Sequence, residues 1–575
     1  MHCILLTLLA LAPGLAIADN DFRPQVREAL ARGEKRIVIP PGRYVLAPEN
    51  NGKVVWGLNG LKEVDIIADG VTLVSTKLTR AVNIDNCTRV TLQGLSIDYD
   101  PLPFTQGVVV KAADDGNSID VRIHDGYAVK PFSRIDVVDP ATRFRKKGMP
   151  FLWGTKAEVV DEHTVRVTLS KIAKAAQPGD LVSLNTGQAS DGIPHALSIG
   201  HGDQITLKNV SVLSAPGMGI LECDGEGGSK FLGCRVVPGP KPAGATEERL
   251  LSSSWDAMQS KTIKRGPEVD RCEVSHAGDD SWSVQSSDYM VLKREGREIV
   301  IASRDAFMDG VFVGDRLRAN LEGSEVVVTA RRRVDRKDAG LSPEVTEKLG
   351  KAQNWSLWQV APWCLVLTLD RDCPFDTGTS VYSPDRMGNG FSFTRNRIHS
   401  SGRVLIKAGG RIEENILDTP HALSVCPEVP DNAAAGIDNL VIRKNRIRSA
   451  GWFCYAPWSA AAGAISIVSG IKPPGFQPAG VFRDVVIEDN VIEDCPVTNL
   501  VATSTKGLTI RNNRFVRPLQ ENANDTGASY QIPRDRVIWV KDSTDVQQIG
   551  NTIDSPGPKV NAQPILVLPG QVSGR

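Results

Sequence analysis

A short phrase that recurs along the chain constrains the fold more than any other feature. Each copy has an apolar-x-apolar stretch, a polar residue, an Asn, Cys or Gly nearby, and a further apolar position. The copies are ITLKNVSV (205–212), KFLGCRVV (230–237), VDRCEV (269–274), FSFTRNRI (391–398), LVIRKNRI (440–447), VVIEDNVI (485–492) and LTIRNNRF (508–515). Asn513 follows Asn490 by 23 residues, and Cys234 follows Asn209 by 25. A period of this length indicates a solenoid of stacked repeats.

Short strands at this spacing, separated by Gly, Asn, Asp and Ser turns, predict an all-β fold, a right-handed parallel β-helix whose coils stack about 4.8 Å apart. We expect the recurrent Asn to form an internal ladder whose side-chain amides bond backbone groups of the turns. Cys234 and Cys272 occupy matching positions in two phrases and are predicted to stack inside it. Because no Cys-x-x-Cys pair is present, neither a metal nor a cofactor is expected. One or two disulfides remain open in an oxidising compartment.

Two regions interrupt the period. Residues 104–190 and 286–385 contain longer alternating strands and hairpin turns, and each has a Gly-Asp turn before an apolar strand, PGDLVSL and VGDRLRA. We predict two small antiparallel β-barrels inserted on the functional face of the solenoid. The β-helix itself is then expected over residues 19–103, 191–285 and 386–575.

The N-terminus predicts export. Residues 1–18 have an apolar centre and end in Ala16-Ile17-Ala18, the pattern of a cleavable signal peptide, so we expect a periplasmic or secreted protein. Other stretches are not apolar enough to span a membrane. The 67 Lys+Arg balance 67 Asp+Glu, which argues against nucleic acid as a partner and favours a neutral or locally held ligand. The sequence leaves the oligomeric state open, a homodimer included.

Acidic and amide residues recur at one place in consecutive coils, in MGILECDG, SWDAMQS and GDDSWSVQ. Asp279 follows Asp256 by 23 residues, one coil, so Asp256 is expected beside the pair Asp279 and Asp280. Clustered carboxylates raise one another's pKa, so that one stays protonated while another is ionised. Glycoside hydrolysis requires this division, an acid for the leaving oxygen and a base or nucleophile across the ring. The spacing alone chooses neither inversion nor retention.

Other side chains around these aspartates are candidate ligands for a sugar. Trp255 and Trp282 flank the carboxylates and are either stacking platforms or core residues. Arg403 and Lys407, in GRVLIKAGG, either bind hydroxyl groups and tune the acids or lie in solvent. His276 is interpreted as a polar spacer. The predicted substrate-binding set is Glu222, Asp224, Trp255, Gln259, Trp282, Gln285, Arg403 and Lys407.

These residues together resemble glycoside hydrolase family 110. The likeness lies in the solenoid phrase, the paired insertions, LSIDYDPLPFTQG (95–107), the Asp256-to-Asp279 spacing with DDSWSV, and TRNRIHSSGRVLIKAGGRIEENIL (394–417). It implies an inverting, exo-acting β-helix α-1,3-galactosidase that removes terminal galactose from glycans. Asp256 would then be the general acid, and Asp279 and Asp280 would position and deprotonate the water. Ser283-Val284-Gln285 replaces the Asn-Val-His that follows the aspartates in the family pattern, so the sugar and linkage stay open.

Two other functions stay open on the sequence. A polysaccharide lyase or epimerase acting on uronate polymers would use a basic residue beside acidic ones, as Arg403, Lys407 and the aspartates allow. A non-catalytic glycan-binding β-helix would show exposed aromatic residues without converging carboxylates. GHGD (200–203) is similar to a polygalacturonase motif, but His201 precedes Asp279 by 78 residues, the reverse of the order in those enzymes, and we interpret it as a turn.

Overall fold

The computed structural model describes most of the chain, and the predicted signal peptide and Cys454 lie outside the described residues. Those residues are 21–49, 52–149, 152–169, 176–185, 194–303, 308–319, 323–345, 347, 362–421, 423–426, 436–453, 462–471, 474–521 and 528–570.

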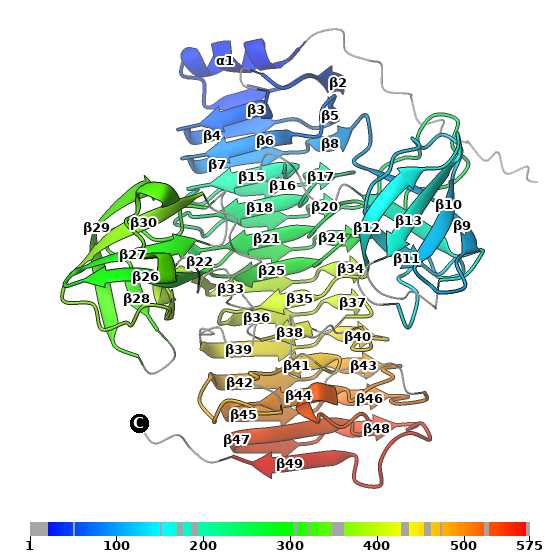
Figure 1. Ribbon diagram of the computed structural model, residues 1–575, viewed down its shortest axis with the longest axis vertical. Coiled ribbons are helices and arrows are strands. Elements are labelled where there is room, and N and C mark those ends of the chain that lie inside the picture. Colours follow the sequence, from blue (N-terminus) through cyan, green and yellow to red (C-terminus); the bar gives the residue numbers. More distant parts are fainter. Residues whose placement is uncertain are drawn as a thin grey trace, which may run out of the picture.

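The protein is a right-handed parallel β-helix, as the repeat predicts, and its coils rise along the long axis of the molecule (Figure 1). Each coil contributes one strand to each of three parallel sheets, here called A, B and C. The chain visits them in the order C, B, A.

Sheet A consists of β2 (Gly42–Leu46), β5 (Val71–Ser75), β8 (Ser96–Tyr99), β17 (Ser211–Val212), β20 (Arg235–Val236), β24 (Glu273–Ser275), β34 (Arg397–His399), β37 (Ile416–Asp418), β40 (Arg446–Arg448), β43 (Val491–Glu493), β46 (Arg514–Val516) and β48 (Thr552–Asp554). Sheet B consists of β1 (Arg36–Val38), β4 (Lys62–Ile67), β7 (Thr88–Gln93), β16 (Thr206–Lys208), β19 (Lys230–Leu232), β23 (Glu268–Asp270), β33 (Phe391–Thr394), β36 (Gly410–Glu413), β39 (Ile437–Arg443), β42 (Phe482–Glu488), β45 (Thr505–Arg511) and part of β47 (Ile538–Ile549). Sheet C consists of β3 (Val54–Asn59), β6 (Arg80–Asp85), β15 (Leu197–Gly200), β18 (Ile220–Cys223), β21 (Met258–Lys261), β25 (Trp282–Gln285), β35 (Val404–Ile406), β38 (Leu423–Val425), β41 (Ile465–Ile467), β44 (Leu500–Thr503), the other part of β47, and β49 (Ile565–Pro569).

Smaller elements complete the solenoid. The helix α1 (Arg23–Ala31) covers its N-terminal end with Val26 and Ala29 buried. A short parallel pair, β22 (Ile263–Arg265) and β32 (Met387–Asn389), lies beside sheet B. The 3-10 turns are η1 (Arg336–Asp338), η2 (Pro384–Arg386) and η3 (Ala528–Tyr530).

An asparagine ladder runs through the corner between sheets B and A. Asn415 Nδ2 donates to Asn445 Oδ1 at 2.9 Å, Asn445 Nδ2 to Asn490 Oδ1 at 3.0 Å, and Asn490 Nδ2 to Asn513 Oδ1 at 2.9 Å. Each of these three amides also donates to a backbone carbonyl of the neighbouring coil, which satisfies a buried turn. The ladder extends from Asn396 to Asn551.

The ladder differs from the predicted one in its N-terminal coils. The pairing of β16 with β19 sets Lys208 opposite Leu232, so Val210 stacks on Cys234, and Asn209 stacks on Gly233. Asn209 is therefore not a rung of the ladder; it takes the left-handed turn position, with φ of 53°. Cys234 and Cys272 are buried in the stack as predicted, and Cys87, Cys223, Cys234, Cys272, Cys364, Cys373 and Cys495 form no disulfide.

We predict that Asn445→Ala destabilises the solenoid. The change removes one rung and leaves the amide of Asn415 and the carbonyl of Ile412 without their partner. Each unsatisfied buried group costs about 1–3 kcal/mol. The urea midpoint measured by far-UV circular dichroism should fall, whereas Asn59→Ala, at an exposed position of β3, should leave it within error. An unchanged midpoint for Asn445→Ala would contradict a structural role for the ladder.

Two closed antiparallel barrels interrupt the solenoid. The first lies between β8 and β15 and comprises β9 (Phe104–Ala112), β10 (Ser118–Ile123), β11 (Arg134–Val138), β12 (Leu152–Val159), β13 (Thr164–Leu169) and β14 (Leu181–Asn185). The second lies between β25 and β33 and comprises β26 (Asp288–Glu295), β27 (Glu298–Ser303), β28 (Arg316–Arg318), β29 (Glu325–Asp335), β30 (Trp363–Leu369) and β31 (Ser380–Tyr382).

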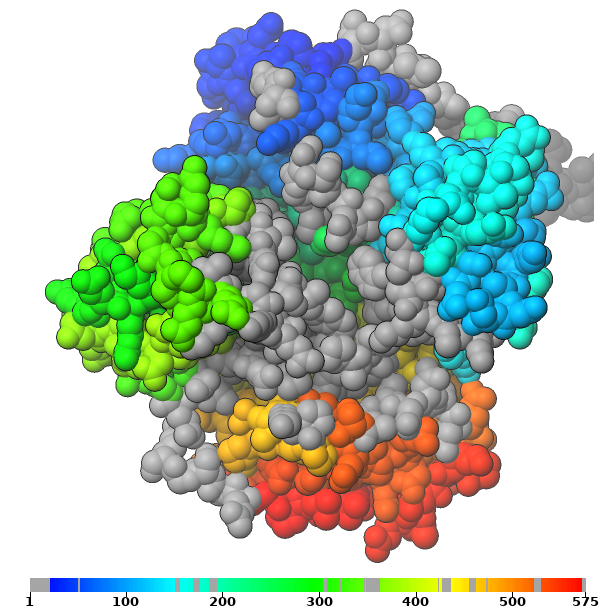
Figure 2. All heavy atoms as spheres, viewed as in Figure 1, coloured from blue at the N-terminus to red at the C-terminus, as the bar shows by residue number. Residues whose placement is uncertain are grey.

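The two barrels stand at the two edges of sheet C. The first leaves from sheet A and returns into sheet C, and the second leaves from sheet C and returns into sheet B. Figure 2 shows the barrels on opposite sides of the solenoid, with part of its green coils visible between them. Among the described residues, no helix has the length and apolarity to cross a membrane.

Candidate functional site

Three aspartates meet where the first barrel adjoins sheet C. One carboxylate oxygen from each of Asp256, Asp279 and Asp280 lies within 4.8 Å of the other two. Asp256 and Asp280 are 7% and 6% exposed, whereas the Asp279 side chain is 37% exposed. The predicted convergence of the three acids is thus present in the structure, with two of them buried and one open to solvent.

The register of the coils differs by one residue from the predicted one. Met258 of β21 pairs with Trp282 of β25, so Asp256 stacks on Asp280 and not on Asp279. The backbone bond from Ala257 N to Asp280 O, at 2.8 Å, shows the same register. The coil from Met258 to Trp282 has 24 residues, one more than the predicted 23, and Asp279 precedes Asp280 in the turn between β24 and β25.

Each aspartate has a different polar neighbour. Gln259 Nε2 donates to Asp256 Oδ2 at 2.9 Å, and Arg403 Nε donates to Asp280 Oδ1 at 2.7 Å. The side chains of Arg403 and Asp280 are both 9% exposed, so this ion pair is buried. Three carboxylates that differ in burial and partners can hold protons unequally, which acid–base catalysis requires.

Arg134 of the first barrel organises the same loops, and the sequence did not reveal it. Its guanidinium donates to Ser254 O at 2.8 Å, to Gly278 O at 2.6 Å and to Asp279 Oδ2 at 3.2 Å. The side chain is 2% exposed. One arginine therefore joins the turn before Asp256 to the turn before Asp279.

We predict that Arg134→Ala lowers kcat about 10- to 100-fold, because a shift of about 1 Å in reacting groups costs up to about 100-fold. The change leaves two buried carbonyls and Asp279 without their donor. Arg166→Ala, in the same barrel at a solvent-facing pair with Asp120, is the matched control. Full turnover by Arg134→Ala would show that the first barrel does not position the acids.

Close packing explains two glycines of this site. A Cβ on Gly402 would lie 1.8 Å from Asp279 O, and one on Gly278 would lie 2.6 Å from Ser254 O. The turn that carries Asp279 is therefore packed between two neighbouring coils. A larger residue at either position would displace the carboxylates.

Glu222 and Trp282 lie inside the solenoid, and this corrects their predicted role as sugar ligands. Trp282 is fully buried, and its ring stacks on Phe393 with centroids 4.5 Å apart. Glu222 is 1% exposed and accepts a 2.8 Å bond from Ser260 Oγ, and burial raises the pKa of its carboxyl group. In β18 the outward-facing residues are instead Leu221 and Cys223, which contact the second barrel.

Asp224 is also not at the aspartate cluster. It follows β18 at the corner of sheets C and B, where its carboxylate accepts the backbone N–H groups of Asp309 at 2.6 Å and Gly310 at 2.9 Å. Burial raises the pKa of Asp224 to about 6. Its predicted role as a hydroxyl ligand is corrected to that of a contact with the second barrel.

The remaining predicted ligands lie on the outer side of sheet C or beside it. Trp255 is half-buried next to Asp256 in sequence and packs against the apolar cluster that includes Met308. Gln285 is 5% exposed, and its Nε2 approaches Ser283 Oγ at 3.4 Å. Lys407 is half-buried after β35. Gln259, Arg403 and Trp255 thus adjoin the carboxylates, and Gln285 and Lys407 lie farther along the sheet.

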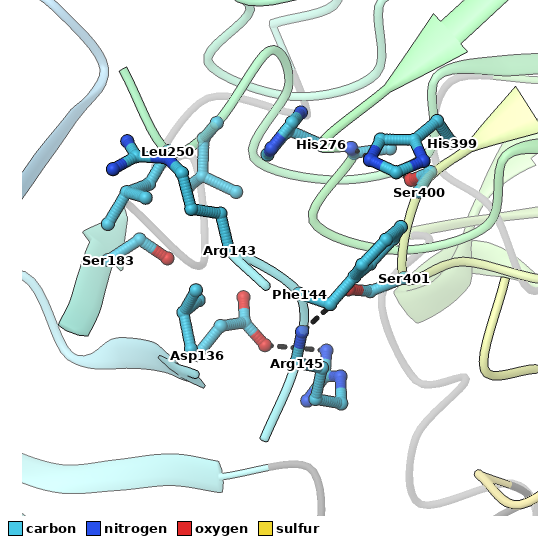
Figure 3. Close-up of a pocket in the computed structure, with 13 residues that line it drawn as sticks. Asp136, Arg143, Phe144, Arg145, Ser183, Leu250, His276, His399, Ser400 and Ser401 are labelled. Atoms are coloured by element: carbon cyan, nitrogen blue, oxygen red, sulfur yellow. Dashed lines mark hydrogen bonds and ion pairs between the residues drawn. The ribbon is translucent and has the colours of Figure 1, made fainter. Parts of the chain in front are cut away.

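His276 faces away from the aspartates, into a small pocket of about 20 Å³ between the first barrel and the solenoid (Figure 3). Arg143, Phe144 and His399 line the same pocket. Burial, together with the charges of His399 and Arg143, lowers the pKa of His276 to about 4. His276 is therefore neutral near pH 7 and belongs to the barrel contact, in keeping with its interpretation as a spacer.

The three aspartates are also the group of side chains, among the described residues, that could hold a metal ion. Oxygen ligands suit Ca²⁺ or Mg²⁺. Arg134 and Arg403 already occupy positions on Asp279 and Asp280, however, and their guanidinium groups would repel a bound cation. The donor set fits acid–base chemistry better than a metal site.

No family model and no curated protein sequence matches the chain. Among solved structures, it is similar to an endo-xylogalacturonan hydrolase from Aspergillus tubingensis, with 9% identity and a TM-score of 0.36 over 97% of this chain and 99% of that one. The family 28 exopolygalacturonase of Yersinia enterocolitica gives 10% identity and a TM-score of 0.37 over 93% and 72%. The A-module of a mannuronan C-5 epimerase from Azotobacter vinelandii gives 9% and 0.31 over 98% of both chains.

Proposed function

We propose that the protein is an exported, exo-acting glycoside hydrolase that uses Asp256, Asp279 and Asp280 for acid–base catalysis. The observation that supports it most is the convergence of the three carboxylates where the first barrel adjoins sheet C. Such a setting supplies what glycoside hydrolysis requires, a proton for the leaving oxygen and a second carboxylate near the anomeric carbon.

The roles follow from the surroundings of each acid. Asp280 forms a buried ion pair with Arg403, and it positions or deprotonates the attacking water. Asp279 is open to solvent, where an attacking water enters, and shares that role. Asp256 is the general acid, and Gln259 orients its carboxyl group. In the reaction, Asp256 gives its proton to the glycosidic oxygen, the C–O bond breaks, and a water deprotonated by the aspartate pair attacks the anomeric carbon.

The proposed substrate is a glycan with a terminal α-1,3-linked galactose, as the resemblance to glycoside hydrolase family 110 implies. Trp255, beside Asp256 and half-buried, is the proposed platform for the sugar ring. Gln285 and Lys407 lie farther along the sheet, where they would meet the rest of the glycan.

Inversion is the proposed stereochemical outcome. The nearest oxygens of the three acids lie within 4.8 Å, whereas inverting enzymes separate the two carboxyl groups by about 6.5–9.5 Å and retaining ones by about 5–5.5 Å. The 4.8 Å limit joins the nearest oxygens of each pair of acids, and it does not give the separation between whole carboxyl groups. Inversion is therefore proposed from the resemblance to glycoside hydrolase family 110. Proton NMR of the first product anomer decides: β-galactose from an α-galactoside shows inversion, and α-galactose shows retention.

The function is tested by incubating the purified protein with p-nitrophenyl α-glycosides, α-1,3-galactosyl oligosaccharides and uronate polymers. We expect release of galactose from chain ends. An ultraviolet absorbance from unsaturated uronates would instead show a lyase, and a change in uronate stereochemistry without cleavage an epimerase. Glycan binding without any reaction would show a non-catalytic lectin-like protein.

A further inference from the structure

The GHGD turn lies in the contact between the solenoid and the second barrel. His201 follows β15, with φ of 49°. Its Nδ1 lies 2.9 Å from Asp85 Oδ1 of the solenoid, and its Nε2 lies 3.3 Å from Asp309 Oδ2 of the second barrel. Because both ring nitrogens face carboxylates, the doubly protonated imidazolium fits this position.

The same barrel segment, residues 308–312, is held by further bonds. Asp224, one coil from His201, accepts the N–H groups of Asp309 and Gly310. Phe312 lies edge-on to the His201 ring, with centroids 6.0 Å apart. His201 thus pairs with the carboxylate of Asp309, and Asp224 binds the backbone N–H groups of the same segment.

An apolar cluster connects this segment to Trp255, the residue before Asp256. Met308, next to Asp309 in sequence, packs in a cluster with Leu221 and Cys223, and Trp255 packs against that cluster. Trp255 directly precedes Asp256. A connected path therefore leads from His201 through Asp309, Met308 and Trp255 to Asp256.

We propose that His201 is a positioning residue, whose imidazolium joins the second barrel to the solenoid and thereby holds Trp255 in place beside Asp256. Its effect on sugar binding rests on the proposed function, whereas the junction itself does not. Loss of the positive charge would leave the carboxylates of Asp85, Asp224 and Asp309 near one another. Arg331 and Arg333 would still lie near Asp309, and Arg80 would still act on Asp85.

The junction should weaken as pH rises. Bonds from Asp309 and Asp85 raise the pKa of His201 from 6.5 to about 10, so its contribution is full below about pH 6.5 and is lost as pH rises through about 10. Because the pKa of Asp224 is raised, its contribution to the junction is also lost as pH rises, between its ordinary 3.8 and about 6. His201 lowers the pKa of Asp309 below 3.8, so that carboxylate's contribution is lost only as pH falls through the lowered value.

The test compares His201→Gln, which removes the charge, with His201→Arg, which keeps a cation at every pH. Hydrogen-exchange protection of the Asp309 and Gly310 amides should fall more than tenfold in His201→Gln and persist in His201→Arg. The KM for the α-galactoside should rise severalfold in His201→Gln with a smaller change in kcat. In the wild type KM should rise between pH 6.5 and 10, and in His201→Arg it should stay level.

His163→Gln, at an exposed histidine of the first barrel, is the control. Unchanged protection of the two amides in His201→Gln would show that the charge of His201 does not hold the second barrel to the solenoid. Lost protection with an unchanged KM would overturn the link to Trp255. If the protein cleaves no galactoside, the exchange experiment still decides the junction, so failure of the proposed function is distinguishable from failure of this inference.

Discussion

Asp280→Asn is expected to reduce kcat about 10²- to 10⁴-fold, the usual contribution of a general base. Asparagine keeps the shape of the side chain but has no negative charge for the buried guanidinium of Arg403, 2.7 Å away, and cannot accept a proton from water. The measurement is kcat on an α-galactoside, together with the thermal midpoint, because removing the carboxylate of a buried ion pair also lowers stability.

The companion variants Asp256→Asn and Asp279→Asn separate the roles. A substrate with a good leaving group, such as p-nitrophenol, should rescue Asp256→Asn in part, since it needs little protonation, and should not rescue Asp280→Asn. Asp114→Asn, in an exposed hairpin turn of the first barrel, should behave as the wild type. Near-normal turnover in all three site variants would show that the cluster is not the reaction centre.

Trp282→Ala should cause the largest loss of stability, about 3–5 kcal/mol. The indole is fully buried between coils, stacked on Phe393 and edge-on to Phe391 at 5.4 Å, so truncation leaves a cavity that the rigid solenoid cannot close. The urea midpoint of the variant should fall well below that of the wild type.

Two further variants make the stability result specific. Trp282→Phe should recover most of the loss, since it restores an aromatic ring at the stack. Trp255→Ala, at the half-buried platform, should raise KM with a smaller change in stability. A normal midpoint with a raised KM in Trp282→Ala would place the indole at the sugar and not in the core.

The parts of the structure that repeat could be predicted from the sequence. The phrase around Asn445, Asn490 and Asn513 predicted both the solenoid and its ladder, because one amide serves the same turn in every coil. The spacing of Asp256 and Asp279 likewise predicted that the acids meet. Its error was one residue, since this coil has 24 residues where the repeat predicts 23, and an average period does not show that one coil is longer.

The direction in which side chains point on sheet C could not be predicted. Both faces of β18 and β25 are buried, one in the core and one toward the surrounding chain, so polar and apolar residues do not alternate cleanly. Glu222 and Trp282 therefore looked like surface ligands and lie inside. Arg134 was missed for a different reason: it comes from an insertion 145 residues before Asp279, and no periodic signal connects them.

The barrels have a consequence for engineering. Each is closed by pairing between its first and last strands, β9 with β14 and β26 with β31, so the chain leaves and re-enters the solenoid at neighbouring points. The coils that flank each barrel pair directly with one another, β6 with β15 and β23 with β33, without help from the insertion. Each barrel is thus a module that could be exchanged between related solenoids, but an exchange of the first barrel would have to keep Arg134, which joins the turns of Asp256 and Asp279.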